Sequence, residues 1–180
     1  MRDLITRQKV IDFMQAFGRL AKTDVSVYLT GGSTAVIEGW RETTVDIDIK
    51  FMPEPDEMFR GIPEIKESLH LNIELAAPSD FIPELPGWRD RSSFIEKIGK
   101  TTFYHYDPYS QVLSKLERSH EKDLLDVEAM FERGMITVPR LKALFDEILP
   151  QLYRYPALAP EQFASTVEKW CTTHLDRPKK

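Results

Sequence analysis

The sequence predicts an α+β fold, in which a small mixed β-sheet is flanked by helices and followed by a helical C-terminal region. Short segments with strand-like patterns lie between residues 25 and 106, and helical spacing of apolar residues prevails after Pro108. The 180 residues, of which 42% are hydrophobic, are enough to bury one core. We therefore expect a domain over residues 1–134 and a helical extension over residues 135–180, packed on the same unit.

The first two predicted elements lead into a glycine turn. Apolar residues recur at helical spacing across residues 3–22, which predicts an amphipathic helix. Residues 25–29 form a short β-branched and aromatic run, which Gly31 and Gly32 follow closely. This pattern predicts a strand that ends in a tight turn.

A short helix and an acidic strand are expected after this turn. Ser33 is a favourable N-cap for a helix that runs through Glu38 and ends near Gly39. Residues 43–51 alternate in polarity, which predicts a strand with one buried face and one polar face. The predicted buried face carries Val45, Ile47, Ile49 and Phe51, and the polar face carries Asp46, Asp48 and Lys50.

The next two elements add a helix and a further strand. Helical spacing predicts a helix over residues 55–69. A strand is expected over residues 71–76, because polar and apolar residues alternate there. Its predicted core side carries Leu71, Ile73 and Leu75, and its other side carries Asn72 and Glu74.

The remaining chain reads as a loop, a hairpin and a series of helices. Proline and turn-forming residues predict a loop over residues 78–91. Residues 94–98 and 101–106, joined by Gly99 and Lys100, predict a hairpin. Helices are expected over residues 108–120, 122–133, 138–152 and 161–174.

The charge and the cysteine content narrow the function classes. A net charge of −5 argues against a protein whose whole surface binds nucleic acid, because that mode needs many basic residues. Four basic residues could still form a local basic groove or belong to a solvated loop: Arg89, Arg91, Lys97 and Lys100. Cys171 is the single cysteine, the N-terminus lacks an apolar signal segment, and no apolar run approaches the roughly 20 residues that cross a bilayer. We expect a cytoplasmic location without membrane insertion.

One group of residues has the properties of a ligand-binding site. Gly31, Gly32 and Ser33, called the glycine turn below, are followed after twelve residues by Asp46 and Asp48. Glycines let the backbone approach a ligand, and amides at a helix start can bind phosphate oxygens. Two aspartates two positions apart on a strand project from one face, so their oxygens can converge on a hard cation. Alone, each piece is usually an ordinary turn or a solvated strand face; their combination indicates a phosphate and metal site.

This arrangement resembles the nucleotidyltransferase superfamily related to polymerase beta, whose hallmark is Gly-Ser, a short helix and Asp-x-Asp on the next strand. The match extends over residues 31–48 in residue type and spacing. The resemblance implies that Asp46 and Asp48 hold Mg²⁺ (or Mn²⁺) and that the glycine turn binds the nucleotide. In that superfamily a later strand supplies a third carboxylate, for which Glu74 is the best-placed residue here, either as a metal ligand or as the group that accepts the proton of the incoming hydroxyl.

A second resemblance lies in residues 109–126. The run Tyr-Ser-Gln-Val-Leu-Ser-Lys-Leu-Glu-Arg, followed by Lys-Asp-Leu-Leu-Asp, resembles the helical part of minimal nucleotidyltransferases of toxin–antitoxin systems, including the abortive-infection AbiEii type. The resemblance implies a catalytic lysine and three nucleotide-binding residues, which are Lys115, Arg118, Asp123 and Asp126. For Asp123 and Asp126, helix-capping charge and surface ion pairing remain the alternative.

Together the two resemblances imply a metal-dependent enzyme that transfers a nucleoside monophosphate from an NTP to an acceptor hydroxyl. The acceptor would be a protein, a tRNA end or a small molecule, and a cognate toxin or antitoxin would be a partner. The alternative is a catalytically inactive binding or antitoxin-like module that kept the fold. An ATPase-type phosphate loop is not supported, because no Gly-Lys-Ser/Thr follows the glycine turn.

Overall fold

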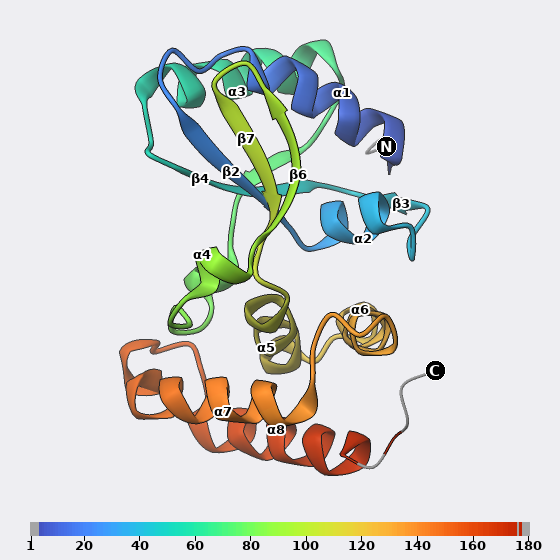
Figure 1. Cartoon of the computed structure of the whole chain (residues 1–180), viewed down its shortest axis with the longest axis vertical. Helices are drawn as coiled ribbons and strands as arrows, with labels where there is room; N and C mark the ends of the chain where they lie inside the picture. Colours follow the sequence, from blue (N-terminus) through green and yellow to red (C-terminus); the bar gives the residue numbers. More distant parts are fainter. Residues whose placement is uncertain (1–3, 176, 178–180) are drawn as a thin grey trace. The chain divides into compact units, whose positions relative to one another are not determined.

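A computed structural model of the chain confirms the predicted α+β fold (Figure 1). It describes residues 4–175 and residue 177. The chain forms two compact units, the first from residues 1–77 and 92–106 and the second from residues 78–91 and 107–180. Among the described helices, none combines the length and the apolar composition that crossing a membrane requires.

A five-stranded mixed sheet forms the centre of the first unit. In spatial order its strands are β5 (Ile73–Leu75), β4 (Ile47–Met52), β2 (Val25–Thr30), β7 (Thr101–His105) and β6 (Ser93–Ile98). The central strand β2 runs antiparallel to β4 and parallel to β7. At the edges, β5 runs parallel to β4 and β6 runs antiparallel to β7. The predicted hairpin and the mixed character of the sheet are therefore confirmed.

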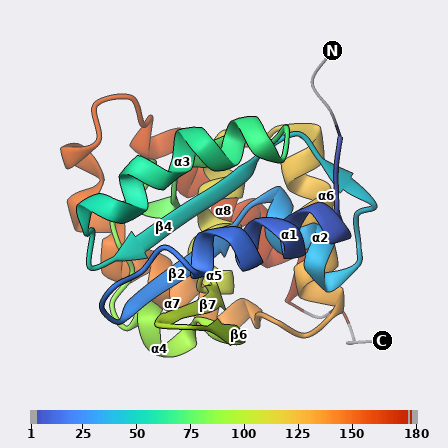
Figure 2. The ribbon, with the colours of Figure 1, turned by 90° about the horizontal axis from the view of Figure 1, so that it is seen from above.

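Two helices cover one face of this sheet (Figure 2). They are α1 (Arg7–Gly18) and α3 (Asp56–Ser68), which also pack against each other. Strand alternation supplies the covered face with apolar side chains, because every second residue points toward it. Buried members of this core include Val27, Leu29, Ile47, Ile49, Phe103, Phe13 and Phe17. The side chains of the residues between them on each strand point to the opposite face of the sheet.

The first helix is shorter than the predicted span of residues 3–22. It begins after Thr6, whose side chain accepts a hydrogen bond from the Lys9 backbone N–H at 3.5 Å. The preceding residues form β1 (Ile5–Thr6), which pairs antiparallel with β3 (Thr43–Thr44). Strands of two residues carry no periodic pattern, so no sequence signal marks this pairing. Asp3 lies outside the described residues.

Two residues that were expected to face the core are exposed. The predicted single strand over residues 43–51 is broken into β3 and β4, and Val45, which lies in the break, is 43% exposed. Leu75 ends the edge strand β5 and is 52% exposed. Alternation places a side chain in the core only where the strand ladder continues under a covering element, which holds for neither residue.

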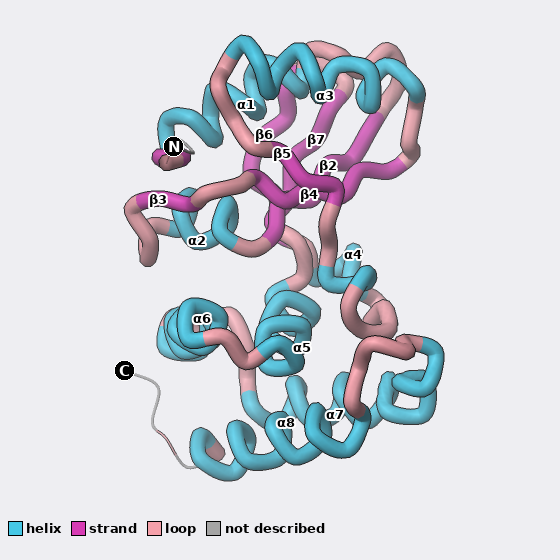
Figure 3. Tube along the Cα trace, turned by 180° about the vertical axis from the view of Figure 1, so that it is seen from behind, coloured by secondary structure: helices cyan, strands magenta, loops and turns pink. Residues whose placement is uncertain are grey.

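Helix α5 (Pro108–Arg118) is the central element of the second unit (Figure 3). It packs against α6 (Glu121–Glu132), α7 (Val138–Ile148), α8 (Pro160–His174) and the 3₁₀ helix η1 (Pro78–Asp80). The four predicted C-terminal helices are thus confirmed, with η2 (Leu149–Arg154) directly after α7. This unit contains residues on both sides of position 134, and a domain over residues 1–134 with an extension over residues 135–180 stays a prediction.

The segment over residues 78–91 is more ordered than the predicted loop. It contains η1 and a short helix, α4 (Trp88–Arg91), because its apolar residues Ile82, Leu85 and Trp88 are buried. Arg91, considered above for a basic groove, instead binds the buried carboxylate of Asp107 through its Nε at 3.0 Å and its Nη2 at 2.8 Å.

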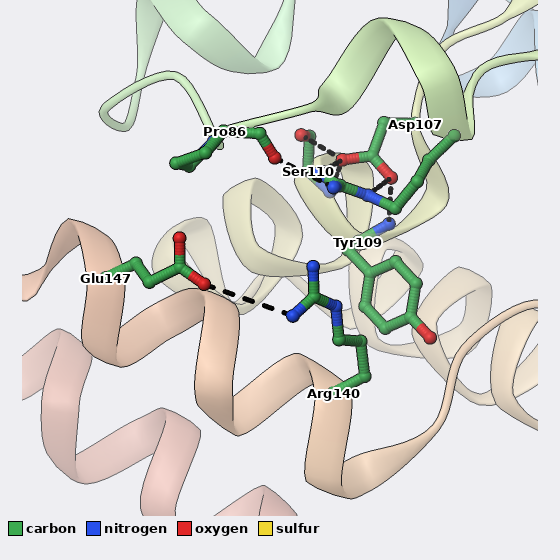
Figure 4. A network of polar contacts seen from close by, with 7 residues as sticks. Pro86, Asp107, Tyr109, Ser110, Arg140 and Glu147 are labelled. Carbon is green, nitrogen blue, oxygen red and sulfur yellow. Dashed lines mark hydrogen bonds and ion pairs between the residues drawn. The ribbon is translucent and has the colours of Figure 1, made fainter.

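Asp107 caps helix α5 as well (Figure 4). Its carboxylate accepts hydrogen bonds from the backbone N–H groups of Tyr109 and Ser110 at 3.2 and 3.3 Å, and from the Ser110 hydroxyl at 2.7 Å. Such a cap satisfies amide groups that have no partner within the helix. The start of α5, seven residues before Lys115, is therefore firmly fixed within its unit.

Candidate functional site

Strand pairing brings the predicted carboxylates together beside the glycine turn. Thr30, the last residue of β2, is in register with Asp48 on β4. On its other side, Asp48 is in register with Glu74 on β5. Asp46 precedes β4 in the break after β3 rather than on a continuous strand. The carboxylate oxygens of Asp46, Asp48 and Glu74 lie within 4.8 Å of one another, so all three belong to one cluster.

The spacing of this acidic cluster suits one divalent cation. Mg²⁺ binds oxygen at about 2.1 Å in octahedral geometry, which places ligand oxygens roughly 3 to 4.2 Å apart. Separations of up to 4.8 Å need only a small contraction to reach that range. Asp46 and Asp48 are half-buried, whereas Glu74 is exposed and accepts a hydrogen bond from Asn72 Nδ2 at 2.8 Å. The residues present therefore fit a hard cation, with Glu74 on the open side.

The glycine turn is held where only glycine fits. Gly31 has φ 62° and ψ −131°, a conformation that residues with a β-carbon rarely adopt. A β-carbon at Gly31 would lie 2.8 Å from Asp48 Oδ2, and one at Gly32 would overlap the Thr44 side chain. The two glycines thus allow the turn to lie directly against Asp48 on β4 and Thr44 on β3.

The expectation that Ser33 is an N-cap is wrong, because Gly31 occupies that position and Ser33 lies inside α2 (Gly32–Glu38). The Ser33 side chain is fully buried. Among the described residues, its Oγ is the buried side-chain polar atom that has no hydrogen-bond partner. Leaving a buried hydroxyl unpaired costs about 1–3 kcal/mol. A polar ligand at the turn would supply the missing partner.

A buried histidine on β7 contacts both ends of α2. His105 Nε2 lies 3.0 Å from Glu38 Oε1, and His105 Nδ1 lies 3.3 Å from Thr34 Oγ1. No pattern in the sequence predicts these contacts. Glu38 and His105 are distant in sequence, and they meet only because β7 pairs in parallel with β2, where His105 is in register with Leu29. No local motif could have revealed this contact.

The four residues of the second resemblance meet within the second unit. Lys115 Nζ lies 2.7 Å from Asp126 Oδ2 and 3.2 Å from Asp123 Oδ1, and Arg118 Nη2 lies 3.0 Å from Asp123 Oδ1. Lys115, Asp123 and Asp126 are buried, so this ion pairing is not the surface pairing considered above. The network contains two cations and two anions. Its contact with a nucleotide stays a prediction.

Comparison with known proteins identifies a family for this chain. Residues 8–170 match a family model described as "Nucleotidyltransferase of unknown function (DUF6036)". No curated protein and no solved structure gives a significant match. The matched range includes the glycine turn, the acidic cluster and the Lys115 network.

Proposed function

Because the chain belongs to the DUF6036 family of nucleotidyltransferases of unknown function, we propose that it transfers a nucleoside monophosphate from an NTP to an acceptor hydroxyl with the help of a divalent cation. The observation that carries this proposal is the convergence of Asp46, Asp48 and Glu74 beside the glycine turn. A cluster of like charges against a backbone that only glycine can form is costly, and binding of a cation and a phosphate would offset that cost.

Asp46, Asp48 and Glu74 would hold Mg²⁺ or Mn²⁺. When bound, the cation would neutralise the charge that develops on the phosphate oxygens during in-line displacement at the α-phosphorus. The backbone amides of the glycine turn and the Ser33 hydroxyl would bind phosphate oxygens and orient them. The acceptor oxygen forms a bond to the α-phosphorus, the bond from that phosphorus to the bridging oxygen breaks, and pyrophosphate leaves.

Glu74 is the best-placed group for the proton of the acceptor hydroxyl. It is the exposed member of the acidic cluster, and only one of its oxygens is engaged by Asn72 in the contacts given above. A general base must lie within hydrogen-bond reach of the proton that it accepts. Glu74 therefore either accepts this proton or completes the metal site.

The roles of Lys115, Arg118, Asp123 and Asp126 as catalytic and nucleotide-binding residues are also part of the proposal, and the AbiEii-type resemblance supports them. The same resemblance supports a protein, a tRNA end or a small molecule as the acceptor, and a cognate toxin or antitoxin as a partner. A catalytically inactive nucleotide-binding or antitoxin-like module is the alternative. The pairing of Lys115 with two buried carboxylates supports this alternative, since such a network also serves to stabilise the second unit without any role in transfer.

The test is transfer of an α-labelled nucleotide. The protein is incubated with Mg²⁺, cell extract and each of the four α-³²P-labelled NTPs in turn, and the labelled fraction is separated into protein, RNA and small molecules. We expect label in one fraction with the wild type and none with the Asp46→Asn/Asp48→Asn variant. Metal-dependent NTP binding without any labelled product would favour the inactive module, and the absence of both binding and labelling would contradict the proposal.

A further inference from the structure

The glycine turn leads into the short helix α2, which packs against α1, β2, β3 and β4 and buries five of its seven residues. Thr34 lies in its first turn and Glu38 is its last residue. The ring of His105 contacts the side chains of both, at 3.3 and 3.0 Å. Thr34 and His105 are buried. One ring on β7, the strand next to the central strand β2, thus contacts the short helix at its start and at its end.

A neutral imidazole has one donor and one acceptor nitrogen, which match the two contacts of the His105 ring. If Nε2 carries the hydrogen, it donates to the Glu38 carboxylate, and Nδ1 accepts from the Thr34 hydroxyl. The Thr34 hydroxyl has a single hydrogen and is also placed to donate it to the Leu29 carbonyl at 3.2 Å, but that carbonyl accepts the Tyr106 backbone N–H at 2.8 Å as well. The Thr34 hydroxyl can therefore donate to His105 without leaving that carbonyl unsatisfied.

The surroundings of His105 agree with this tautomer. Burial lowers the pKa of His105, and the neighbouring Glu38 carboxylate opposes this effect without reversing it. The imidazole is therefore neutral near pH 7 and has one donor and one acceptor nitrogen. A neutral ring with two different partners has a defined orientation, which a freely rotating side chain would lack.

We propose that the chain of contacts from Glu38 through His105 to Thr34 is a positioning device that holds the glycine turn at the correct distance from Asp48. The proposal rests on the proposed function, since the turn is the part that would bind phosphate. Thr34 directly follows Ser33, and Gly31 leaves no room for a β-carbon beside Asp48. A small tilt of α2 therefore changes the separation between the turn and the acidic cluster. His105 acts through α2, which it contacts at Thr34 and Glu38.

The experiment compares Glu38→Ala with the conservative variant Glu38→Gln. Glutamine retains an oxygen that accepts the Nε2 hydrogen, whereas alanine does not. Glu64→Ala, at an exposed position on α3, is the matched control for loss of a glutamate. Two quantities are measured on the full chain. The first is hydrogen exchange of the Gly31, Gly32 and Ser33 amides without ligand, and the second is the affinity for Mg²⁺ with the α,β-methylene analogue of each NTP.

We expect Glu38→Ala to speed exchange at the turn and to weaken analogue binding, each by about tenfold, which corresponds to the loss of one hydrogen bond to a charged group. Glu38→Gln and Glu64→Ala should resemble the wild type in both measurements. Thr34→Val, which removes the other contact of the ring while keeping the side-chain volume, should reproduce the alanine result if Glu38→Ala does not fold.

The outcomes separate this inference from the proposed function. Faster exchange in Glu38→Ala, combined with a wild type that binds no analogue, would support the positioning device and contradict the proposed function. Unchanged exchange and unchanged affinity in folded Glu38→Ala and Thr34→Val would overturn the inference. A loss of affinity in Glu38→Gln equal to that in Glu38→Ala would also overturn it, because the carboxylate charge rather than the hydrogen bond would then be responsible.

Discussion

At the scale of single residues, the crowding of Asp46, Asp48 and Glu74 predicts an unusual response to neutralisation. Like charges within 4.8 Å repel one another without a cation. The Asp46→Asn/Asp48→Asn variant should therefore have the same or a higher unfolding temperature than the wild type in the absence of ligand. It should lose the further rise that Mg²⁺ and NTP give the wild type. Thermal melts of both proteins, with and without Mg²⁺ and NTP, measure this.

The same melts test the opposite account, in which the two aspartates are ordinary structural residues. Removing a buried charged partner would then lower stability, by about 1–3 kcal/mol. Lys50 follows Asp48 on the polar face of β4, and its charge acts against the repulsion. A less stable variant together with a wild type that shows no ligand-induced shift would contradict the active-site assignment.

His105 predicts a pH dependence of stability with a definite sign. Burial lowers its pKa below the ordinary value of 6.5, so the unfolded chain binds a proton more readily than the folded chain does. Its contribution to the free energy of unfolding is complete above pH 6.5 and is lost as the pH falls below that value. The difference in unfolding free energy between the wild type and His105→Gln should therefore shrink between pH 7.5 and 5.5.

Denaturant titrations at a series of pH values measure this difference, and the subtraction cancels the titration of groups common to both proteins. A difference that instead grows on acidification would mean that an imidazolium paired with Glu38 prevails. The neutral tautomer on which the positioning argument depends would then be wrong.

At the scale of elements, we expect a substitution in the glycine turn to have two separate effects, one on stability and one on nucleotide binding. Gly31→Ala should lose stability, because φ is positive, and should also lose nucleotide binding, because the added methyl meets Asp48 Oδ2. Gly39→Ala is the matched control, since Gly39 has φ 83° but open space around its position. Each substitution should cost about 1–3 kcal/mol of stability. Calorimetry with Mg²⁺ and NTP should show weaker binding for Gly31→Ala alone; equal affinities would contradict the close approach.

The elements also show what the sequence can predict. The alternation of polar and apolar residues predicts that Asp48 points away from the core. The glycines predict a turn at the end of the preceding strand. Both signals are local in the sequence. Glu74 depended on the register between β4 and β5, which only the folded sheet fixes. Val45 and Leu75 follow the alternating pattern but are exposed. Val45 lies in the break between β3 and β4, and Leu75 lies at the end of the edge strand β5. The contact between Glu38 and His105 needs the parallel pairing of distant strands, for which periodicity carries no information.

At the scale of the whole molecule, the candidate residues are divided between two units. The acidic cluster and the glycine turn belong to the first, and the Lys115 network belongs to the second. The family match over residues 8–170 spans both units, so the second unit is as much a part of the family as the sheet. The role of Lys115 in nucleotide binding is therefore tested separately from that of the acidic cluster.

Substitution of Lys115 tests whether this residue binds the nucleotide. A single substitution to alanine is not a clean test, because it also lowers the stability of the second unit. Lys115→Ala would remove the ammonium group from the buried Asp126 and leave Asp123 to its ion pair with Arg118, which should cost about 3–5 kcal/mol and reduce binding through unfolding alone. The double variant Lys115→Met/Asp126→Asn removes one charge of each sign and keeps the side-chain volumes similar, so it should recover most of that stability. If Lys115 binds the triphosphate, this folded double variant should still bind Mg²⁺ and NTP at least tenfold more weakly than the wild type, because hydrogen bonds to charged groups contribute about 1.5–3 kcal/mol. Wild-type affinity in the double variant, measured by calorimetry below its unfolding temperature, would assign Lys115 to the stability of the second unit and confine the nucleotide site to the first.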